Sequence, residues 1–272
     1  MDIDEKTYLC QVGKDVSCGA CCGLYNVPDP SRDGLTALLA RRSEEFSGLA
    51  RTESAIDAFA LAESRRVPVS ARPYPDFHHC PFLGLVGEGV SRAGCLLHPE
   101  GAGNRGVDLR GLSWYGGFAC RTYFCKSHRG LPNEWKAVVK ALVPGWHAYG
   151  LVVTETDMLA GFFGLAEKRL GRPLTADFIL SHPVRRAAAE RFLGLKESWP
   201  FRPEGSPRIC HYLFEDGLYP DPPIPYEELG APYSAFDAVL RALGSDFSSA
   251  GDLAAAEGIL EGIMSRLLHE AR

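Results

Sequence analysis

Eight of the nine cysteines in this 272-residue chain lie between Cys10 and Cys125, and only Cys210 lies outside that interval. A chain that concentrates its thiols in one stretch uses them as disulfides, as metal or redox groups, or as small buried apolar side chains. Cys210 stands in an apolar run, and we interpret it as a small hydrophobic side chain. The asymmetry predicts a Cys-rich domain over residues 1–130, followed by a helical domain over residues 131–272.

The net charge and the first residues indicate where such a protein works. Residues 1–6 are acidic and lack the apolar run of a secretory signal, and no stretch approaches the ~20 apolar residues that span a bilayer. The net charge of −5 and the sequence pI near 5.9 argue against a nucleic-acid or membrane partner. We therefore expect a cytoplasmic protein, in which clustered cysteines are metal ligands or redox groups rather than disulfides.

The clustered cysteines fall into four short motifs. They are Cys18-Gly19-Ala20-Cys21-Cys22 with Cys10 upstream, Cys80-Pro81-Phe82-Leu83, Gly94-Cys95-Leu96-Leu97-His98-Pro99, and Cys120-Arg121-Thr122-Tyr123-Phe124-Cys125. A two-residue gap lets two sulfurs reach one ion or cluster at about 2.3 Å, and Gly19 permits the tight loop that this gap needs. Backbone amides in such loops also stabilise thiolates. We therefore predict these metal ligands: Cys10, Cys18, Cys21, Cys22, Cys80, Cys95, Cys120 and Cys125.

The adjacent pair Cys21–Cys22 bears on the kind of centre. Neighbouring side chains diverge, so these two thiolates suit two neighbouring sites, or different irons of one polynuclear cluster, better than one tetrahedral ion. Eight thiolates suffice for two four-cysteine sites. Their number does not choose between zinc and iron–sulfur, because both accept all-thiolate tetrahedral ligation.

Other interpretations of these motifs stay open. A dithiol redox role for Cys18 and Cys21 is conceivable, although no thioredoxin-like βαβ pattern surrounds them. His79 and His98 each lie beside a cysteine motif, and either imidazole could replace a thiolate, while a hydrogen-bonded loop histidine is the commoner outcome. No hydrolase, P-loop or zinc-protease motif appears.

Apolar periodicity predicts a mainly α fold of the α+β kind, in which a small Cys-rich metal-binding lobe with a short β-hairpin packs on a helical C-terminal region. A helical insertion is expected over about residues 33–67, and the glycines of residues 87–89 predict the hairpin turn. Thr156 and Ser234 are expected to cap helices. The later helices are expected near residues 135–142, 159–170, 236–243 and 253–267.

Taken in order, the cysteine motifs resemble the CxxCxxCC family, also called YkgJ-like, which is described as a family of zinc- or iron-chelating domains. The resemblance covers about residues 10–128. It is carried by Cys18, Cys21–Cys22, Cys80, Gly94-Cys95 and Cys120-Arg121 with Cys125. The family has a further cysteine three residues before the one matched by Cys18, where this chain has Asp15. Either Cys10, from farther upstream, or Asp15 itself then completes the first site.

The family includes flagellin lysine-N-methylases, which are associated with an iron–sulfur cluster. The resemblance therefore implies an iron–sulfur cluster of the 4Fe–4S type as cofactor, with Zn²⁺ as the alternative. It also implies a role in electron transfer, redox sensing or assistance to protein modification, with another protein as partner. In this interpretation Arg121 and Tyr123 lie around the cluster and tune its potential and its access to solvent.

Two alternative functions stay open. One is a zinc-stabilised, non-catalytic protein-binding module, whose helical half grips a partner protein. The other is an S-adenosylmethionine-dependent protein lysine methylase-like enzyme, which follows from the resemblance alone. No S-adenosylmethionine-binding signature appears, so the sequence leaves open whether the chain is an enzyme.

Overall fold

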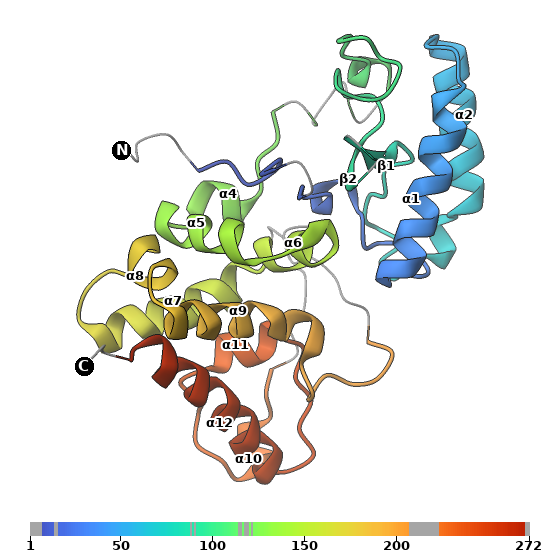
Figure 1. Ribbon diagram of the computed structural model, residues 1–272. Coiled ribbons are helices and arrows are strands. Elements are labelled where there is room, and N and C mark those ends of the chain that lie inside the picture. Colours follow the sequence, from blue (N-terminus) through green and yellow to red (C-terminus); the bar gives the residue numbers. More distant parts are fainter. Residues whose placement is uncertain are drawn as a thin grey trace.

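Helices form most of the molecule, and one short β-hairpin is the sheet found in the part of the chain that the structure describes (Figure 1). This architecture confirms the mainly helical fold with a short hairpin that the sequence predicts. The computed structural model describes residues 7–13, 16–87, 89, 91–113, 116, 120, 122–206 and 223–269. None of the helices in these ranges combines the length and the apolar character that a bilayer crossing requires.

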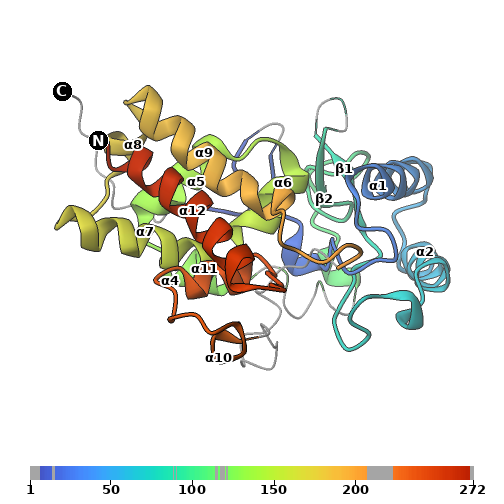
Figure 2. The same ribbon diagram turned by 90° about the horizontal axis from the view of Figure 1, so that it is seen from below.

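Two helices form the predicted insertion. Helix α1 (Arg32–Ser47) and helix α2 (Glu53–Arg66) lie side by side at one end of the molecule (Figures 1 and 2). Each begins at a hydroxyl N-cap: the side chains of Ser31 and Thr52 accept the backbone N–H three residues further along. The apolar faces of both helices are buried in a core that also contains residues next to the cysteines.

The hairpin is held by α1. Strand β1 (Leu83–Val86) pairs antiparallel with β2 (Arg92–Cys95), around the turn that the sequence predicts. The Ser43 hydroxyl on α1 accepts the N–H of Leu85 at 2.7 Å and donates to its carbonyl at 2.9 Å. The helix thereby covers the outer edge of β1, whose backbone groups the hairpin leaves unpaired.

A buried ion network joins α1, α2 and the chain just before β1. The Glu63 carboxylate accepts hydrogen bonds from Arg41 at 2.7 and 2.8 Å, from Arg42 at 2.6 Å and from Arg66 at 2.6 Å. Glu63 and Arg42 have fully buried side chains. Arg42 also donates to the carbonyl of Cys80 at 3.3 Å. We call these residues the Glu63 network, and it fixes the backbone of a predicted ligand.

The second half of the chain is a helical bundle, reached through the short helix α4 (Lys126–Gly130). Its core is densely aromatic: the rings of Phe162 and Phe192 stack with centroids 3.8 Å apart. The helices are α5 (Asn133–Leu142), α6 (Gly145–Val153), α7 (Thr156–Leu170), α8 (Ala176–Leu180), α9 (Pro183–Ser198), α10 (Tyr226–Leu229), α11 (Asp237–Ala242) and α12 (Ala250–Leu267). Short 3-10 helices also occur at Ala20–Cys22, Val69–Ala71 and Arg110–Leu112.

The two predicted caps in this half are wrong by one and two residues. Thr156 is the first residue of α7, and the N-cap position belongs to Glu155. The Ser234 hydroxyl accepts the N–H of Phe236 at 3.1 Å, before α11 begins, so it stabilises the turn that leads into the helix. Helix starts are the least certain part of a periodicity argument, because the apolar pattern marks a face rather than an end.

Helix α6 links two hydrophobic cores. Trp146 and Leu151 are buried in the core that holds α1, α2 and the hairpin, whereas Tyr149 belongs to the core of the C-terminal helices. The hydroxyl of Tyr149 donates to the carbonyl of Leu9 at 3.1 Å. Residues on both sides of position 130 therefore complete each core, and the predicted domain boundary there stays a prediction.

Candidate metal centre

The thiols predicted as ligands come together around one cavity. No disulfide joins any of the eight cysteines that the structure describes. A cavity of about 620 Å³, which we call the cysteine cavity, is lined by Cys10, Cys18, Cys21, Cys22, Cys80, Cys95 and Cys120. Cys125 lies beside this group, because its thiol interacts electrostatically with those of Cys10 and Cys21. Cys210 lies outside the described residues.

Tight turns position the first four cysteines. The N–H of Cys18 donates to the carbonyl of Cys10 at 2.8 Å. The 3-10 turn Ala20–Cys22 follows and ends at Gly23, whose φ of 72° is left-handed. A Cβ at this position would collide with the backbone carbonyl of His78, so glycine is required there. This close approach places the double cysteine next to the segment that leads into the second motif.

Three later cysteines share one backbone arrangement. An amide N–H two or three positions further along the chain faces the sulfur and acts to lower the pKa of the thiol. The pairs are Phe82 with Cys80, Leu97 and His98 with Cys95, and Ser127 and His128 with Cys125. Hydrogen bonds to sulfur of this kind surround the thiolate ligands of metal clusters. The turns at Cys80, Cys95 and Cys125 therefore present backbone N–H groups to these sulfurs.

Burial affects the pKa of these thiols more strongly than the amides do, so the net pKa is raised. It raises the pKa of Cys10 and Cys95 to about 11, and it raises the pKa of Cys80, Cys120 and Cys125 as well. A thiolate, not a thiol, is the metal ligand. A bound cation must therefore displace these protons, and its own charge supplies the driving force.

Two arginines outside the cysteine motifs face the thiols. Arg110 lines the cysteine cavity, and its charge opposes the rise in the pKa of Cys95 and Cys120. The buried Arg42 does the same for the pKa of Cys80. The sequence carries no signal for either residue, because each lies in a segment without cysteines. Both can offset the negative charge of bound thiolates.

His79 has a structural role. Its Nδ1 lies 2.8 Å from the carbonyl of Gly23, which can only accept, so Nδ1 carries the proton and Nε2 accepts from Arg42 at 3.0 Å. Burial and the charge of Arg42 lower the pKa of His79 to about 3. Both ring nitrogens are engaged, and this geometry argues against the interpretation of His79 as a metal ligand.

The other expected site residues have different outcomes. Tyr123 and His98 line the cysteine cavity, and their predicted roles stay predictions. Tyr8 lines the cavity as well and is 46% exposed, and no motif in the sequence predicts this position. Arg121 and Asp15 lie outside the described residues.

Among the described residues, no three His, Cys, Asp or Glu side chains are grouped so that they could hold a metal ion.

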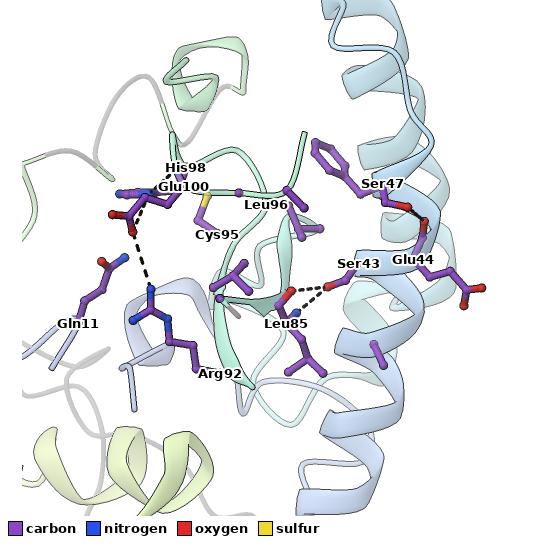
Figure 3. A pocket seen from close by; sticks show the side chains of 16 residues that line it. Gln11, Ser43, Glu44, Ser47, Leu85, Arg92, Cys95, Leu96, His98 and Glu100 are labelled. Carbon is purple, nitrogen blue, oxygen red and sulfur yellow. Dashed lines mark hydrogen bonds and ion pairs between the residues drawn. The ribbon is translucent and has the colours of Figure 1, made fainter. Parts of the chain in front are cut away.

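A second cavity adjoins the first. It has a volume of about 810 Å³ and lies between α1, the hairpin and the loop after Cys95 (Figure 3). Cys95 and His98 line both cavities. On its polar side Arg92 lies 3.8 Å from the carboxylate of Glu100. A molecule bound there would contact the wall of the thiol site.

Comparisons with known proteins add no assignment. No family model, no curated protein and no solved structure matches the chain. The interpretation of the site therefore depends on the chemistry of its own residues.

Proposed function

We propose that this protein binds an iron–sulfur centre of the 4Fe–4S type through its clustered cysteines. Its role would be electron transfer, redox sensing or assistance to a protein-modification reaction, as the resemblance to the CxxCxxCC family suggests. The observation that carries the proposal is the convergence of thiols from four separate segments on one cavity, without disulfides between them. When bound, such a centre supplies one-electron redox chemistry.

The residues around the thiols support this proposal. The amides that follow Cys80, Cys95 and Cys125 face the sulfurs, and Arg42 and Arg110 bring positive charge. Hydrogen bonds and positive charges near the sulfurs favour the more negative, reduced state, so they raise a reduction potential. The cavity also reaches the surface, since Tyr123, which lines it, is 37% exposed. An electron could therefore pass to a docked protein without crossing the core.

Protein purified without oxygen is expected to be brown, with broad absorbance near 400 nm, and to contain iron and acid-labile sulfide in equal amounts. Elemental analysis of the same sample measures both. Colourless protein with stoichiometric zinc would contradict the proposal and would favour the zinc-stabilised binding module. The Cys210→Ser variant serves as a control, because Cys210 lies outside the cysteine motifs and its loss should leave the iron content unchanged.

A second candidate function is the S-adenosylmethionine-dependent enzyme, and the adjoining cavity is the observation that favours it. A volume of about 810 Å³ lies within the range of small-molecule sites. Calorimetric titration of S-adenosylmethionine into the anaerobic protein should then show binding. The sulfonium and ammonium groups of that molecule are positive, so Glu100→Gln should weaken binding while Glu53→Gln, on the exposed start of α2, should not. No heat of binding would eliminate this candidate.

A further inference from the structure

The second cavity has an apolar wall and a polar wall. Helix α1 and the hairpin segment supply the apolar one, through Ala40, Phe46, Leu85, Val86 and Leu96. Polar side chains lie on the other side, and they are Gln11, Arg92, His98 and Glu100 (Figure 3). A cavity of about 810 Å³ with two such walls suits a small organic molecule that carries a charged head on an apolar body.

One edge of the Arg92 guanidinium lacks partners in the described part of the chain. Its Nη1 donates to the carbonyl of Gly13, whereas its Nε is buried and makes no hydrogen bond to any described residue. Its Nη2 lies 3.8 Å from the carboxylate of Glu100, which is beyond hydrogen-bonding distance. Nε and Nη2 form one side of the planar group, and together they can donate two parallel hydrogen bonds to one carboxylate.

A buried donor without an acceptor costs free energy, and it calls for an explanation. The side chain of Arg92 is only 14% exposed, so water reaches little of it. An anionic group inside the cavity would accept from Nε and Nη2 at once. The unpartnered edge therefore indicates a ligand with a carboxylate.

The carboxylate of Glu100 is available on the same wall. Within the described ranges it accepts no hydrogen bond, and its side chain is 70% exposed. Nδ1 of His98 lies 4.0 Å from this carboxylate, but it accepts the backbone N–H of Glu100 at 3.3 Å, so it has no proton to donate. A positive group on the ligand could therefore donate to Glu100 beside the carboxylate that Arg92 holds.

The charges around the cavity select the kind of head. Among the described residues that line it, Arg92 is the one permanent cation, while Glu44 and Glu100 are acids. A phosphate would bring nearly two negative charges beside these acids, with a single guanidinium to offset them. A zwitterionic head adds no net charge and satisfies both Arg92 and Glu100.

We propose that this cavity binds an α-amino acid, or a molecule with a free α-amino acid head, whose body is apolar. The carboxylate of the ligand accepts from Nε and Nη2 of Arg92, and its ammonium group donates to Glu100. Its body packs against Leu85 and Val86 of the hairpin. The inference does not depend on the iron–sulfur centre, because none of these contacts involves a thiol.

Calorimetric titration of the full chain with L-phenylalanine tests the proposal. Phenylpropanoate lacks the ammonium group and phenylethylamine lacks the carboxylate, so each should bind at least about tenfold more weakly than phenylalanine. Glycine keeps the head and lacks the apolar body, and it should also bind at least about tenfold more weakly. No binding of phenylalanine at about 10 mM, or equal binding of phenylalanine and the two analogues, overturns the proposal.

Variants assign each charge of the head to its partner. Arg92→Met should weaken the binding of phenylalanine at least about tenfold and leave that of phenylethylamine unchanged. Glu100→Gln should weaken the binding of phenylalanine and leave that of phenylpropanoate unchanged. A damaged fold would weaken all three ligands together, and circular dichroism checks for it. Arg65→Met, at an exposed position of α2, is the matched control and should bind like the wild type. An Arg92→Met variant that binds phenylalanine like the wild type overturns the proposal.

The same samples separate this inference from the proposed functions. Binding of phenylalanine by protein that takes up no iron would support the inference and contradict the iron–sulfur proposal. S-Adenosylmethionine carries the same head on a larger body. Binding of S-adenosylmethionine without binding of phenylalanine would favour the second candidate function and overturn the inference.

Discussion

Replacing Glu63 with glutamine is expected to lower the free energy of unfolding by about 3–5 kcal/mol, because removal of one partner leaves a buried charge without its counterion. The guanidinium of Arg42 has no exposed surface and makes its shortest hydrogen bond, 2.6 Å, to Glu63. Urea unfolding at neutral pH measures the change. Arg42 also donates to the carbonyl of Cys80, so the proposed function adds the expectation that this variant binds iron more weakly than the wild type.

Glu45→Gln is the matched control for this prediction. Its carboxylate contacts Arg41 and Arg66, as Glu63 does, but its side chain is 37% exposed. Exposed ion pairs contribute about 1 kcal/mol or less, so this variant should be nearly as stable as the wild type. If Glu63→Gln and Glu45→Gln lost the same free energy of unfolding, the idea that burial decides the strength of the network would be contradicted.

The Glu63 network should also make the free energy of unfolding depend on pH. Burial raises the pKa of Glu63, but the hydrogen bonds from Arg41, Arg42 and Arg66 outweigh it and lower the pKa from 4.5 to about 2. Since the folded-state pKa is the lower one, the carboxylate stabilises the fold above pH 4.5 and this contribution is lost as pH falls from about 5 toward 2. The stability of Glu63→Gln should therefore fall less steeply over that range.

Removal of the bound metal is expected to lower the melting temperature by at least about 10 °C, which corresponds to ~3–5 kcal/mol in a chain of this size. This prediction rests on the proposed function. The free energy of metal binding contributes directly to folding, and a two-stranded hairpin of four-residue strands has little stability of its own. Calorimetry of the reconstituted protein, before and after anaerobic chelation, measures the shift.

Reloading provides the control for that experiment. The melting temperature should return when iron and sulfide are added back, which separates metal loss from irreversible damage. If the stripped and loaded proteins melt at the same temperature, the cysteines do not hold a structural centre. The metal would then be absent or bound too weakly to matter for folding.

The sequence predicts local features of this fold well. The glycines of residues 87–89 and the apolar spacing of α1 are local signals, and the strands of the hairpin and the helix form where they are expected. The sequence indicates a helix-like stretch around Arg185–Arg186, but apolar spacing does not give the bounds of α9, because two of its buried positions are Ala188 and Ala189, which add little to an apolar pattern. Its place is set by packing, including the stack of Phe192 on Phe162.

The candidate site was predicted only in part, for the same reason. Cysteine spacing identifies the thiols that gather at the cavity. The role of His79 depends on Arg42, which lies 37 positions earlier in the chain and belongs to no recognisable motif. Arg110 likewise reaches Cys95 and Cys120 only through the fold. Contacts between distant segments decide which polar side chains serve the thiols, and no local spacing encodes them.

The position of α6 determines how this protein can be divided. A fragment that ended at residue 130 would lose Trp146 and Leu151, which fill the core beneath the double cysteine. It would also leave the Tyr25 hydroxyl without the His147 carbonyl to which it donates at 2.6 Å. The Cys-rich half takes part of its core from the other half, so an isolated thiol-bearing piece should extend at least through Leu151 to keep that core filled.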